Sequence, residues 1–398
     1  MYRLVQRRGI IGLFCLLFVA SSVVPGWAQK DNRFEVSKNL DIFNSLLKEV
    51  EMFYVDSVDV DKTVQRGIEA MLAGLDPYTE YYPEQKTEEL SLMTTGEYGG
   101  IGSLIRQRNN EGGVMIAEPT EGMPADLAGL KPGDLILAID TIDVSKATNS
   151  RVSELLKGVP NTKMVLTIQR PGEKKPRKFE ITRKQITTPQ VTYYGVKNDS
   201  IGYIYLKAFT IKSAQEVKEA FLDLKKNHNI KSLVLDLRGN GGGVLEGAVQ
   251  IVGMFVPKGS EVLSTKGKIK QWDRTYRTST EPLDTVMPLA ILINGGTASA
   301  AEIVSGSLQD MDRAVLVGQR SFGKGLVQAP RDLPYNGKVK ITMSKYYIPS
   351  GRCIQQIDYS HRKEDGSVAA IPDSLTSVFY TSKKRPVRDG GGVRPEFE

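Results

Sequence analysis

Residues 233–243 read Leu-Val-Leu-Asp-Leu-Arg-Gly-Asn-Gly-Gly-Gly, and this stretch decides the fold class. Its apolar start has the length of a buried strand, and residues 245–256 continue with the apolar spacing of a helix. The same order of strand, glycine turn and helix returns at residues 289–293 and 298–308, and another strand follows at 314–317. This alternation predicts an α/β fold whose functional site lies at the carboxyl ends of the strands.

The glycine-rich loop 239–243 has three interpretations. Its backbone N–H groups can gather on a phosphate, they can build an oxyanion hole, or the loop is only a tight turn between strand and helix. Four of its five residues are glycine, so the loop has few side-chain anchors and can change its backbone conformation. The loop alone does not separate these interpretations.

A second turn, residues 294–302, suggests a nucleophile. Two glycines follow a strand, and a helix of small residues begins with Ser299 in its first turn. The positive end of a helix dipole favours an attacking alkoxide and a developing oxyanion. An ordinary helix-capping serine or threonine fits the same positions.

A serine nucleophile needs a base, and the chain contains only two histidines. His228 and His361 both lie in polar or charged runs, which is typical of solvated surface residues. A lysine can replace histidine when burial lowers its pKa from about 10.4. Lys324 is flanked by apolar residues and glycines without an acid close in sequence, and Gln328 could hydrogen-bond its amine. Lys324 is therefore the candidate base.

Residues 318–324 also match the phosphate-binding pattern GxxxxGK, but the pattern is incomplete. Gly325 stands where a serine or threonine would hold magnesium, and Pro330 and Pro334 exclude the helix that should follow. We therefore do not expect a nucleotide triphosphatase. Two histidines and two cysteines are also too few for a metal cluster or a disulfide framework, so we expect neither a metal nor another cofactor.

Composition excludes further classes of protein. The chain has 53 Lys or Arg and 46 Asp or Glu, a net charge of +7, and three of the arginines lie within residues 1–28. The remainder is only mildly basic, so we expect no nucleic-acid partner. Hydrophobic residues make up 40% and charged residues 25% of the chain. This balance excludes wholesale disorder and a polytopic membrane protein.

The N-terminus is typical of an export signal. Three arginines within residues 3–8 precede an apolar run at 10–19, and small residues suggest cleavage after Ala28. An uncleaved anchor is the alternative, because no charge follows until Lys30, although the apolar run is short for a membrane span. Either interpretation predicts a periplasmic or other extracytoplasmic protein, associated with a membrane only if the segment is retained.

Changes in pattern divide the chain into four parts. After the signal at residues 1–28, apolar residues three and four apart predict a helical region at 29–95. Residues 96–185 form a β-rich module with short alternating strands, and residues 186–398 form the α/β core. The Lys-, Arg- and Gly-rich tail from residue 382 is expected to be loosely ordered.

Three blocks, read in order, resemble the carboxyl-terminal processing peptidases, also called tail-specific proteases. They are DLRGNGGG at 236–243, GTASAAEI at 296–303 and SFGKGLVQ at 321–328. The first and third are specific to that family, and the conjunction of all three is more specific still. The resemblance thus rests on the same loops that suggested an oxyanion hole, a nucleophile and a base.

The resemblance extends over residues 34–395. LDPYT at 75–79 is similar to the family's signature before its PDZ domain. YGGIG at 98–102 resembles the PDZ carboxylate-binding loop, and ADLAGLKPGD at 125–134 resembles the PDZ core. It implies an α/β core of the crotonase/ClpP-like kind with an inserted β-rich PDZ domain and an N-terminal helical region.

The resemblance also implies roles for individual residues. Ser299 would be the nucleophile of a serine endopeptidase, Lys324 its general base, and Gln328 the residue that orients Lys324. The oxyanion hole would be formed by the amide of Ala300 and that of one glycine in 241–243, for which we choose Gly242.

The PDZ domain would recognise protein or peptide substrates by their free, apolar C-termini. Four residues would present backbone amides to the terminal carboxylate: Gly99, Gly100, Ile101 and Gly102. Three residues would line the pocket for the terminal side chain, unless they only pack the domain: Val152, Leu155 and Leu156. A homo-oligomer is compatible with the resemblance.

Two departures from the family and two alternatives stay open. Ala301 stands where the family often has serine, and many relatives continue beyond Glu398, which concerns oligomer form and activation. The chain could be an inactive PDZ scaffold on a protease-like core, or a crotonase-like acyl-CoA enzyme. The intact Ser299, Lys324 and Gln328 favour the peptidase over the scaffold, and export disfavours acyl-CoA chemistry.

Overall fold

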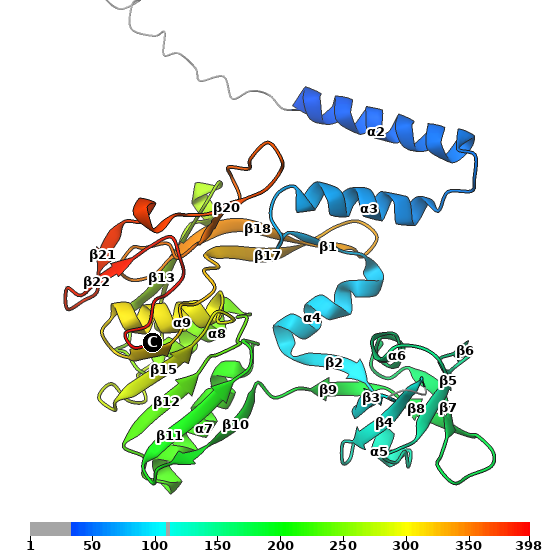
Figure 1. Cartoon of the computed structure of the whole chain (residues 1–398), viewed down its shortest axis with the longest axis horizontal. Helices are drawn as coiled ribbons and strands as arrows, with labels where there is room; N and C mark the ends of the chain where they lie inside the picture. The colour runs from blue at the N-terminus through cyan, green and yellow to red at the C-terminus, as the bar shows by residue number, and fades with distance from the viewer. Residues whose placement is uncertain (1–32, 109–111) are drawn as a thin grey trace, which may run out of the picture. The chain divides into compact units, whose positions relative to one another are not determined.

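The computed structural model describes residues 33–108 and 112–398 and divides into two compact units between Ile68 and Glu69. The first unit holds helix α2 (Arg33–Phe53) and the start of helix α3 (Val60–Ala73) (Figure 1). The predicted helices of this region are thereby confirmed. None of the helices that the structure describes is long and apolar enough to cross a membrane. The predicted signal sequence lies outside the described residues.

The second unit begins with short elements that lead into the β-rich module. They are β1 (Glu80–Tyr82), the 3-10 helix η1 (Glu84–Lys86) and α4 (Thr87–Thr95). The module itself consists of β2 (Glu97–Gly100), β3 (Ser103–Gln107), β4 (Val114–Pro119), α5 (Pro124–Leu127), β5 (Leu135–Ile139), β6 (Ile142–Asp143), α6 (Asn149–Leu156), β7 (Lys163–Gln169), β8 (Arg177–Thr182) and β9 (Lys184–Thr187). Its six-stranded antiparallel sheet encloses a separate apolar core that includes Ile116, Ile136 and Leu166.

The α/β core is built on a five-stranded sheet. Its strands, in spatial order, are β10 (Val191–Lys197), β11 (Ile201–Leu206), β12 (Ser232–Asp236), β15 (Leu289–Ile293) and β16 (Val315–Gly318). The last four are parallel, because the helices α7 (Ser213–Asn227), α8 (Leu245–Gly253) and α9 (Ala300–Asp310) return the chain between them or cover the sheet. The predicted alternation of strands and helices is confirmed, and the carboxyl ends of β12, β15 and β16 share one edge.

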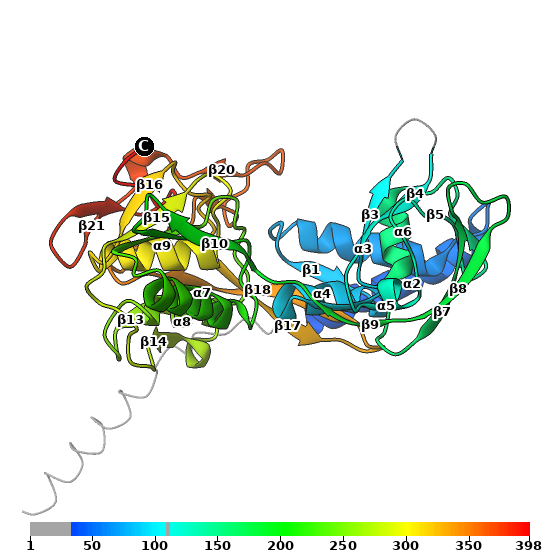
Figure 2. The same ribbon diagram turned by 90° about the horizontal axis from the view of Figure 1, so that it is seen from below.

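A second sheet packs against the same core (Figures 1 and 2). It contains β13 (Glu261–Gly267), β14 (Arg274–Arg277), β17 (Leu326–Asp332), β18 (Lys338–Tyr347) and β1, with the 3-10 helix η2 (Lys270–Trp272) before β14. Helix α9 is buried along its whole length, and Ser307 Oγ on this helix donates to the Val262 carbonyl of β13 at 2.9 Å. Helix α9 therefore lies in the close-packed interior, and this packing holds the residues at its N-terminus in fixed positions.

The expectation of a loosely ordered tail is wrong. Small elements occupy the C-terminal part: β19 (Ile357–Asp358), β20 (Ala369–Ala370), the 3-10 helix η3 (Asp373–Leu375), β21 (Val378–Tyr380) and β22 (Pro386–Arg388). Val393 is fully buried, and Arg385 pairs with Asp312 and Glu396 at 2.6 Å each. Composition misled the prediction, because charges of this tail also pair with residues far away in the sequence, Arg385 with Asp312 and Arg394 with Asp373.

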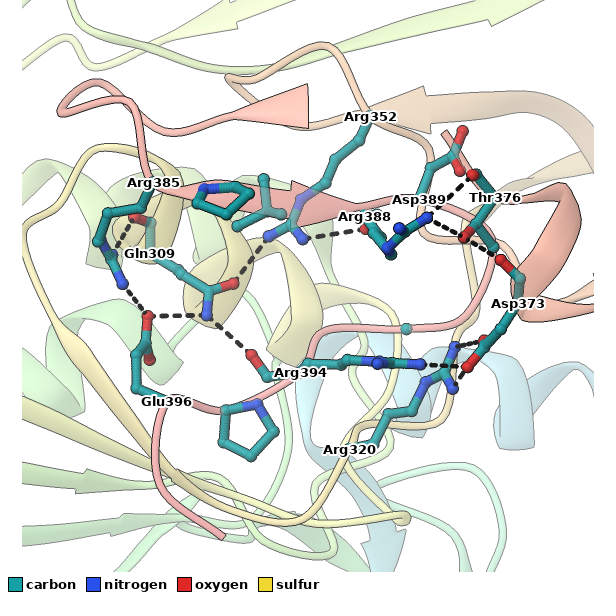
Figure 3. A pocket seen from close by; sticks show the side chains of 14 residues that line it. Gln309, Arg320, Arg352, Asp373, Thr376, Arg385, Arg388, Asp389, Arg394 and Glu396 are labelled. Carbon is teal, nitrogen blue, oxygen red and sulfur yellow. Dashed lines mark hydrogen bonds and ion pairs between the residues drawn. The ribbon is translucent and has the colours of Figure 1, made fainter. Parts of the chain in front are cut away.

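The C-terminal segment also lines a cavity of about 220 Å³ that is rich in arginine (Figure 3). Arg352 is buried there and donates to Asp310 Oδ1 and Gln309 Oε1 at 2.8 Å each. Asp373 pairs with two other arginines of the lining, Arg320 and Arg394. Arg352 thus connects the chain after β18 to α9, and Asp373 connects Arg394 to Arg320 just after β16. None of the predicted catalytic residues lines the cavity.

Candidate active site

Three loops meet at the edge of the parallel sheet where β12, β15 and β16 end. The Ala298 N–H donates to the Asn240 carbonyl at 2.9 Å, which joins the loops after β15 and β12. The Phe322 N–H donates to the Thr297 carbonyl at 2.9 Å, which joins the loops after β16 and β15. The three sequence blocks that suggested a site are therefore neighbours in space, as parallel strands with a common edge require.

Ser299 is the residue immediately before helix α9, and its backbone is strained. Its φ is +54° and its ψ is −116°. These angles are rare for a residue with a side chain and cost on the order of 1–3 kcal/mol, so they persist only where the surroundings enforce them. Here the Ser299 N–H donates to Glu302 Oε2 at 2.8 Å, and the Tyr346 hydroxyl donates to the Ser299 carbonyl at 3.3 Å. A strained strand-to-helix turn is a known way to present a nucleophilic serine.

Glu302 is a fully buried carboxylate that ties the serine loop to the lysine loop. Its Oε2 accepts from the backbone amides of Ser299 at 2.8 Å and Lys324 at 2.9 Å. Its Oε1 accepts from Ser321 Oγ at 2.5 Å and from the Gly323 amide at 2.7 Å. Burial raises the pKa of Glu302 to about 6, although these four hydrogen bonds favour the charged form.

The two candidate oxyanion donors lie next to Ser299. A Cβ placed on Gly242 would lie 2.7 Å from Ser299 Cβ and 2.8 Å from Ala300 N, so only glycine fits there. The Ala300 N–H has no acceptor among the residues that the structure describes. The Gly242 N–H, in contrast, donates to the buried Asn240 Oδ1 at 2.9 Å. One donor is thus free, and the other is turned to a neighbouring side chain.

Lys324 is half-buried, and its pKa is lowered to about 8. Burial is the main cause, and the charge of Lys340 adds to it, while the carboxylates of Asp76, Glu80 and Glu302 act in the opposite direction. The loss of solvent around Lys324 therefore outweighs the nearby carboxylates, and such burial disfavours the charged amine. A lowered pKa lets a useful fraction of this amine be neutral near physiological pH.

The side chains of the predicted catalytic residues form no hydrogen bonds with one another in the part of the chain that the structure describes. Gln328 Nε2 donates to Thr342 Oγ1 at 3.1 Å, and Lys324 Nζ lies 4.1 Å from the centroid of the Tyr78 ring. Within the described ranges no hydrogen bond joins Ser299 Oγ to Lys324 Nζ or Lys324 Nζ to Gln328. Glu302 thus links the backbones of Ser299 and Lys324, while the described hydrogen bonds of the Lys324 and Gln328 side chains do not link the predicted catalytic residues to one another.

The sequence analysis gave no role to two residues that the structure places at this site. Glu302 carried a signal, because a carboxylate three residues after Ser299 fits the capping-box pattern. Tyr78 lies in a motif quoted only for its resemblance, and nothing in its local sequence indicates that it reaches Lys324. Both histidines, His228 and His361, are exposed as predicted, and neither approaches Ser299 in the contacts of the described residues.

The predicted carboxylate-binding loop of the β-rich module divides into two halves. Gly99 and Gly100 belong to strand β2, which pairs with β9, and the Gly99 N–H donates to Glu88 Oε1 at 2.9 Å. Ile101 and Gly102 follow the strand, and in the described part of the chain their amides have no acceptor. The two halves of the loop thus differ, with the Gly99 amide already paired and the amides of Ile101 and Gly102 without a described acceptor.

The three residues predicted to line the pocket for the terminal side chain occupy different surroundings in the structure. Leu156 lines a hollow of about 40 Å³ beside the Ile101–Gly102 half of the loop. Val152 is fully buried in the core of the module, and Leu155 packs half-buried against that core. Ser153 and Lys157 line the hollow as well, and the sequence analysis did not name them.

Known proteins resemble this chain over most of its length. Residues 200–360 match the model of peptidase family S41, and residues 115–170 match a PDZ domain. The chain is 36% identical over 345 residues to the carboxy-terminal-processing protease of Bartonella bacilliformis, which covers 86% of this chain and 77% of that protein. The chain belongs to peptidase family S41.

Other relatives of the S41 peptidase carry similar names. This chain is 33% identical over 320 residues to a probable CtpA-like serine protease of Staphylococcus aureus, and the match covers 79% of this chain and 62% of that protein. The chain thus spans less than two thirds of that relative. Among solved structures, the photosystem II D1 C-terminal processing protease is 29% identical with a TM-score of 0.43, over 77% of this chain and 82% of that one.

Family membership confirms the resemblance and the fold class inferred from sequence. The S41 peptidase is a serine-type peptidase with an α/β core, a PDZ domain and N-terminal helices, and its substrates are peptides or proteins. Neither the inactive scaffold nor the acyl-CoA enzyme gains support from these comparisons.

Proposed function

We propose that this S41 peptidase hydrolyses peptide bonds with Ser299 as nucleophile and Lys324 as general base. The observation that carries the proposal is the single oxygen of Glu302 that accepts the backbone amides of both residues. Lys324 has a pKa of about 8. A serine at a helix N-terminus and a lysine of this kind are the two groups that such a reaction requires.

In the proposed reaction, neutral Lys324 takes the proton of Ser299 Oγ while Oγ attacks the substrate carbonyl carbon. The amides of Ala300 and Gly242 donate to the oxyanion of the tetrahedral intermediate. The intermediate then breaks its C–N bond, and Lys324 passes the proton to the leaving amine. Water attacks the resulting ester with Lys324 again as base, which releases the new C-terminus and restores Ser299.

The described conformation fits a resting state of this machinery. Gln328 is hydrogen-bonded to Thr342, and the Gly242 amide is hydrogen-bonded to Asn240, so neither serves its proposed partner. Loss of one oxyanion donor typically lowers the rate about 100- to 1000-fold. Rotation of one peptide plane at Gly242 would therefore be enough to switch activity without moving Ser299. We propose that a bound substrate tail favours the rotated, active form.

The PDZ domain is proposed to select substrates by their free, apolar C-termini. The amides of Ile101 and Gly102, which have no acceptor among the described residues, suit a terminal carboxylate, and Leu156 offers an apolar wall to the last side chain. Lys157, whose Nζ lies 5.4 Å from the Tyr98 ring centroid, lines the same hollow and brings positive charge to it. The backbone of the substrate would then hydrogen-bond as an added strand to the neighbouring edge of the sheet.

The compartment and the assembly are also proposals. The sequence pattern at residues 1–28 supports export, with association to a membrane only if that segment is retained. The mild positive charge gives no reason to expect nucleic acid as a partner. A homo-oligomer is compatible with the exposed apolar residues of α2, among them Leu40, Phe43 and Leu46.

A denatured protein with an apolar C-terminus tests the proposed function. The wild type should cleave it, and Ser299→Ala and Lys324→Arg should each lower kcat/KM by at least about 1000-fold while they remain folded. Arginine cannot act as a base in this pH range, so its failure separates proton transfer from charge alone. Turnover near that of the wild type in either variant would overturn the assignment of the two residues.

A further inference from the structure

A turn that precedes the PDZ domain lies directly on the proposed base. The turn comprises residues 75–79, and the ring centroid of its Tyr78 lies 4.1 Å from Lys324 Nζ. An ammonium group over an aromatic face at this distance makes a cation–π interaction. The proposed base thus contacts a residue from a distant part of the sequence.

Tyr78 is not a loose surface side chain, because its turn is fixed at several points. The buried Asp76 accepts through Oδ1 from the amides of Tyr78 and Thr79 at 2.8 Å each, and through Oδ2 from Thr79 Oγ1 at 3.0 Å. The Tyr359 hydroxyl donates to the Tyr78 hydroxyl at 3.4 Å, and the two rings meet edge to face at 6.0 Å. The turn therefore holds the Tyr78 ring in a defined place.

The same turn also reaches the residue predicted to orient the base. The Thr342 amide on strand β18 donates to Thr79 Oγ1 at 3.2 Å. Thr342 Oγ1 in turn accepts from Gln328 Nε2 at 3.1 Å. One short segment thus contacts Lys324 directly and is linked to Gln328 through Thr342. The segment is therefore connected to both the proposed base and the residue proposed to orient it.

The charges around Lys324 show what the ring can change. Glu302 of α9, Asp76 of the turn and Glu80 of β1 favour the charged amine, and Lys340 of β18 opposes it. The Tyr78 ring has two effects of opposite sign on this balance. It excludes water, which favours the neutral amine, and its π face attracts the ammonium, which favours the charged one. Substitutions can separate the two effects.

We propose that Tyr78 is a positioning residue for Lys324, whose ring holds Nζ in one place and keeps water from it so that the amine can lose its proton near neutral pH. This proposal rests on the role of Lys324 as general base. It gives the segment 75–79 a mechanistic function, because the turn becomes part of the scaffold of the base.

The test compares the pH dependence of kcat/KM in variants at position 78. Tyr78→Phe keeps the ring, so its pH midpoint should match the wild type and its activity should stay within about threefold. Tyr78→Ala admits water, so its midpoint should rise by about one unit, with kcat/KM about tenfold lower at pH 7 and largely recovered at about pH 9.5. Tyr359→Phe is the matched control, since it removes the same hydroxyl contact and leaves the Tyr78 ring in place.

A second readout does not depend on turnover. In protein labelled with ¹³C at lysine Cε, the Lys324 signal is identified by its loss in Lys324→Arg and should show the low-frequency shift of a group over a ring face. Tyr78→Phe should keep that shift, and Tyr78→Leu should lose it. Tyr78→Leu should also lower the midpoint of the Lys324 titration, because leucine excludes water without attracting the cation, and this variant serves if Tyr78→Ala does not fold.

The outcomes separate the two proposals. If Ser299→Ala and Lys324→Arg retain turnover, the proposed catalytic residues are wrong, whatever Tyr78 does. If both lose turnover but Lys324 titrates with one midpoint in the wild type, Tyr78→Leu and Tyr78→Ala, the role of Tyr78 is overturned. Equal damage from Tyr78→Phe and Tyr78→Ala would overturn it as well, because the ring would then not be the part that matters.

Discussion

The backbone amide of Ser299 donates a 2.8 Å hydrogen bond to the fully buried carboxylate of Glu302. The same oxygen accepts the backbone amide of Lys324 at 2.9 Å. A buried carboxylate of this kind is costly unless its oxygens are satisfied, and here they are satisfied by the loops that carry the proposed nucleophile and base. Correct placement of two side chains therefore depends on a third that need not touch the substrate.

Glu302→Gln should damage both stability and activity. The amide group keeps the shape of the carboxylate, but its NH₂ must face a backbone N–H that needs an acceptor. We expect the free energy of unfolding to fall by about 1–3 kcal/mol and kcat to fall at least about tenfold. Denaturant titration and peptide hydrolysis measure the two effects. Glu281→Gln, at a largely exposed position, is the control. Unchanged kcat in Glu302→Gln would contradict the role of Glu302 in holding the loops of Ser299 and Lys324.

Lys324 should give the enzyme a basic pH profile. Its pKa is about 8. Consequently kcat/KM should rise about tenfold per unit between about pH 6 and 7 and level off above about pH 8, because the neutral amine is the active form. Unfolding should return the pKa of this lysine to about 10.4, so the unfolded state binds more protons between about pH 8 and 10 and stability should rise with pH there. Lys324→Met should lack this contribution, and an identical slope in both proteins would contradict it.

Gly242→Ala and Gly241→Ala form a matched pair in the glycine loop. A Cβ on Gly242 would lie 2.7 Å from both the Ala298 carbonyl oxygen and Ser299 Cβ, at a φ of +93°, whereas a Cβ on Gly241 would meet nothing within 4 Å. Gly242→Ala should lower kcat at least about 100-fold and destabilise the fold by about 1–3 kcal/mol. Gly241→Ala should stay within about threefold of wild type. Equal activities of the two variants would remove Gly242 from the site.

A tail peptide supplied in trans tests the proposed switch. A short substrate without a PDZ-binding sequence is assayed with and without a separate peptide that ends in an apolar residue and a free carboxylate. We expect the peptide to raise kcat, and its C-terminal amide to have no effect, because the amides of Ile101 and Gly102 suit a charged group. If the acid only competes or changes nothing, the site is preformed and the switch is wrong.

Arg352 and Arg394 should differ strongly in the C-terminal segment. The Arg352 side chain is 2% exposed and pairs with the buried Asp310. Arg352→Ala therefore leaves an uncompensated buried charge and should cost about 3–5 kcal/mol of stability. Arg394 pairs with Asp373, and both side chains are about half exposed, so Arg394→Ala should cost less than about 1 kcal/mol. Similar unfolding midpoints for the two variants would contradict the buried position of the Arg352–Asp310 pair.

Much of the fold was predictable because its signals are local. Strand β12 is an apolar run that ends in a glycine-rich turn, and helix α9 begins after a pair of glycines and a serine. Parallel strands share an edge, so the sequence predicted that the site lies at the carboxyl ends of the strands, where the loops with Ser299 and Lys324 lie in the structure. The tail from residue 382 was predicted wrongly, since its order comes from ion pairs such as Arg385–Asp312 that no local pattern contains.

The sequence by itself determined the candidates for chemistry, because residue type and spacing limit which groups could act as nucleophile, base or oxyanion donor. It singled out Ser299, Lys324 and the glycine loop as candidates, and it disfavoured both histidines as the base. Only the tertiary structure decided their present state. The contacts of Lys324 with Tyr78 and of the Gly242 amide with Asn240 are set by side-chain orientation and by segments far apart in the chain, and neither has a signature in the amino-acid sequence.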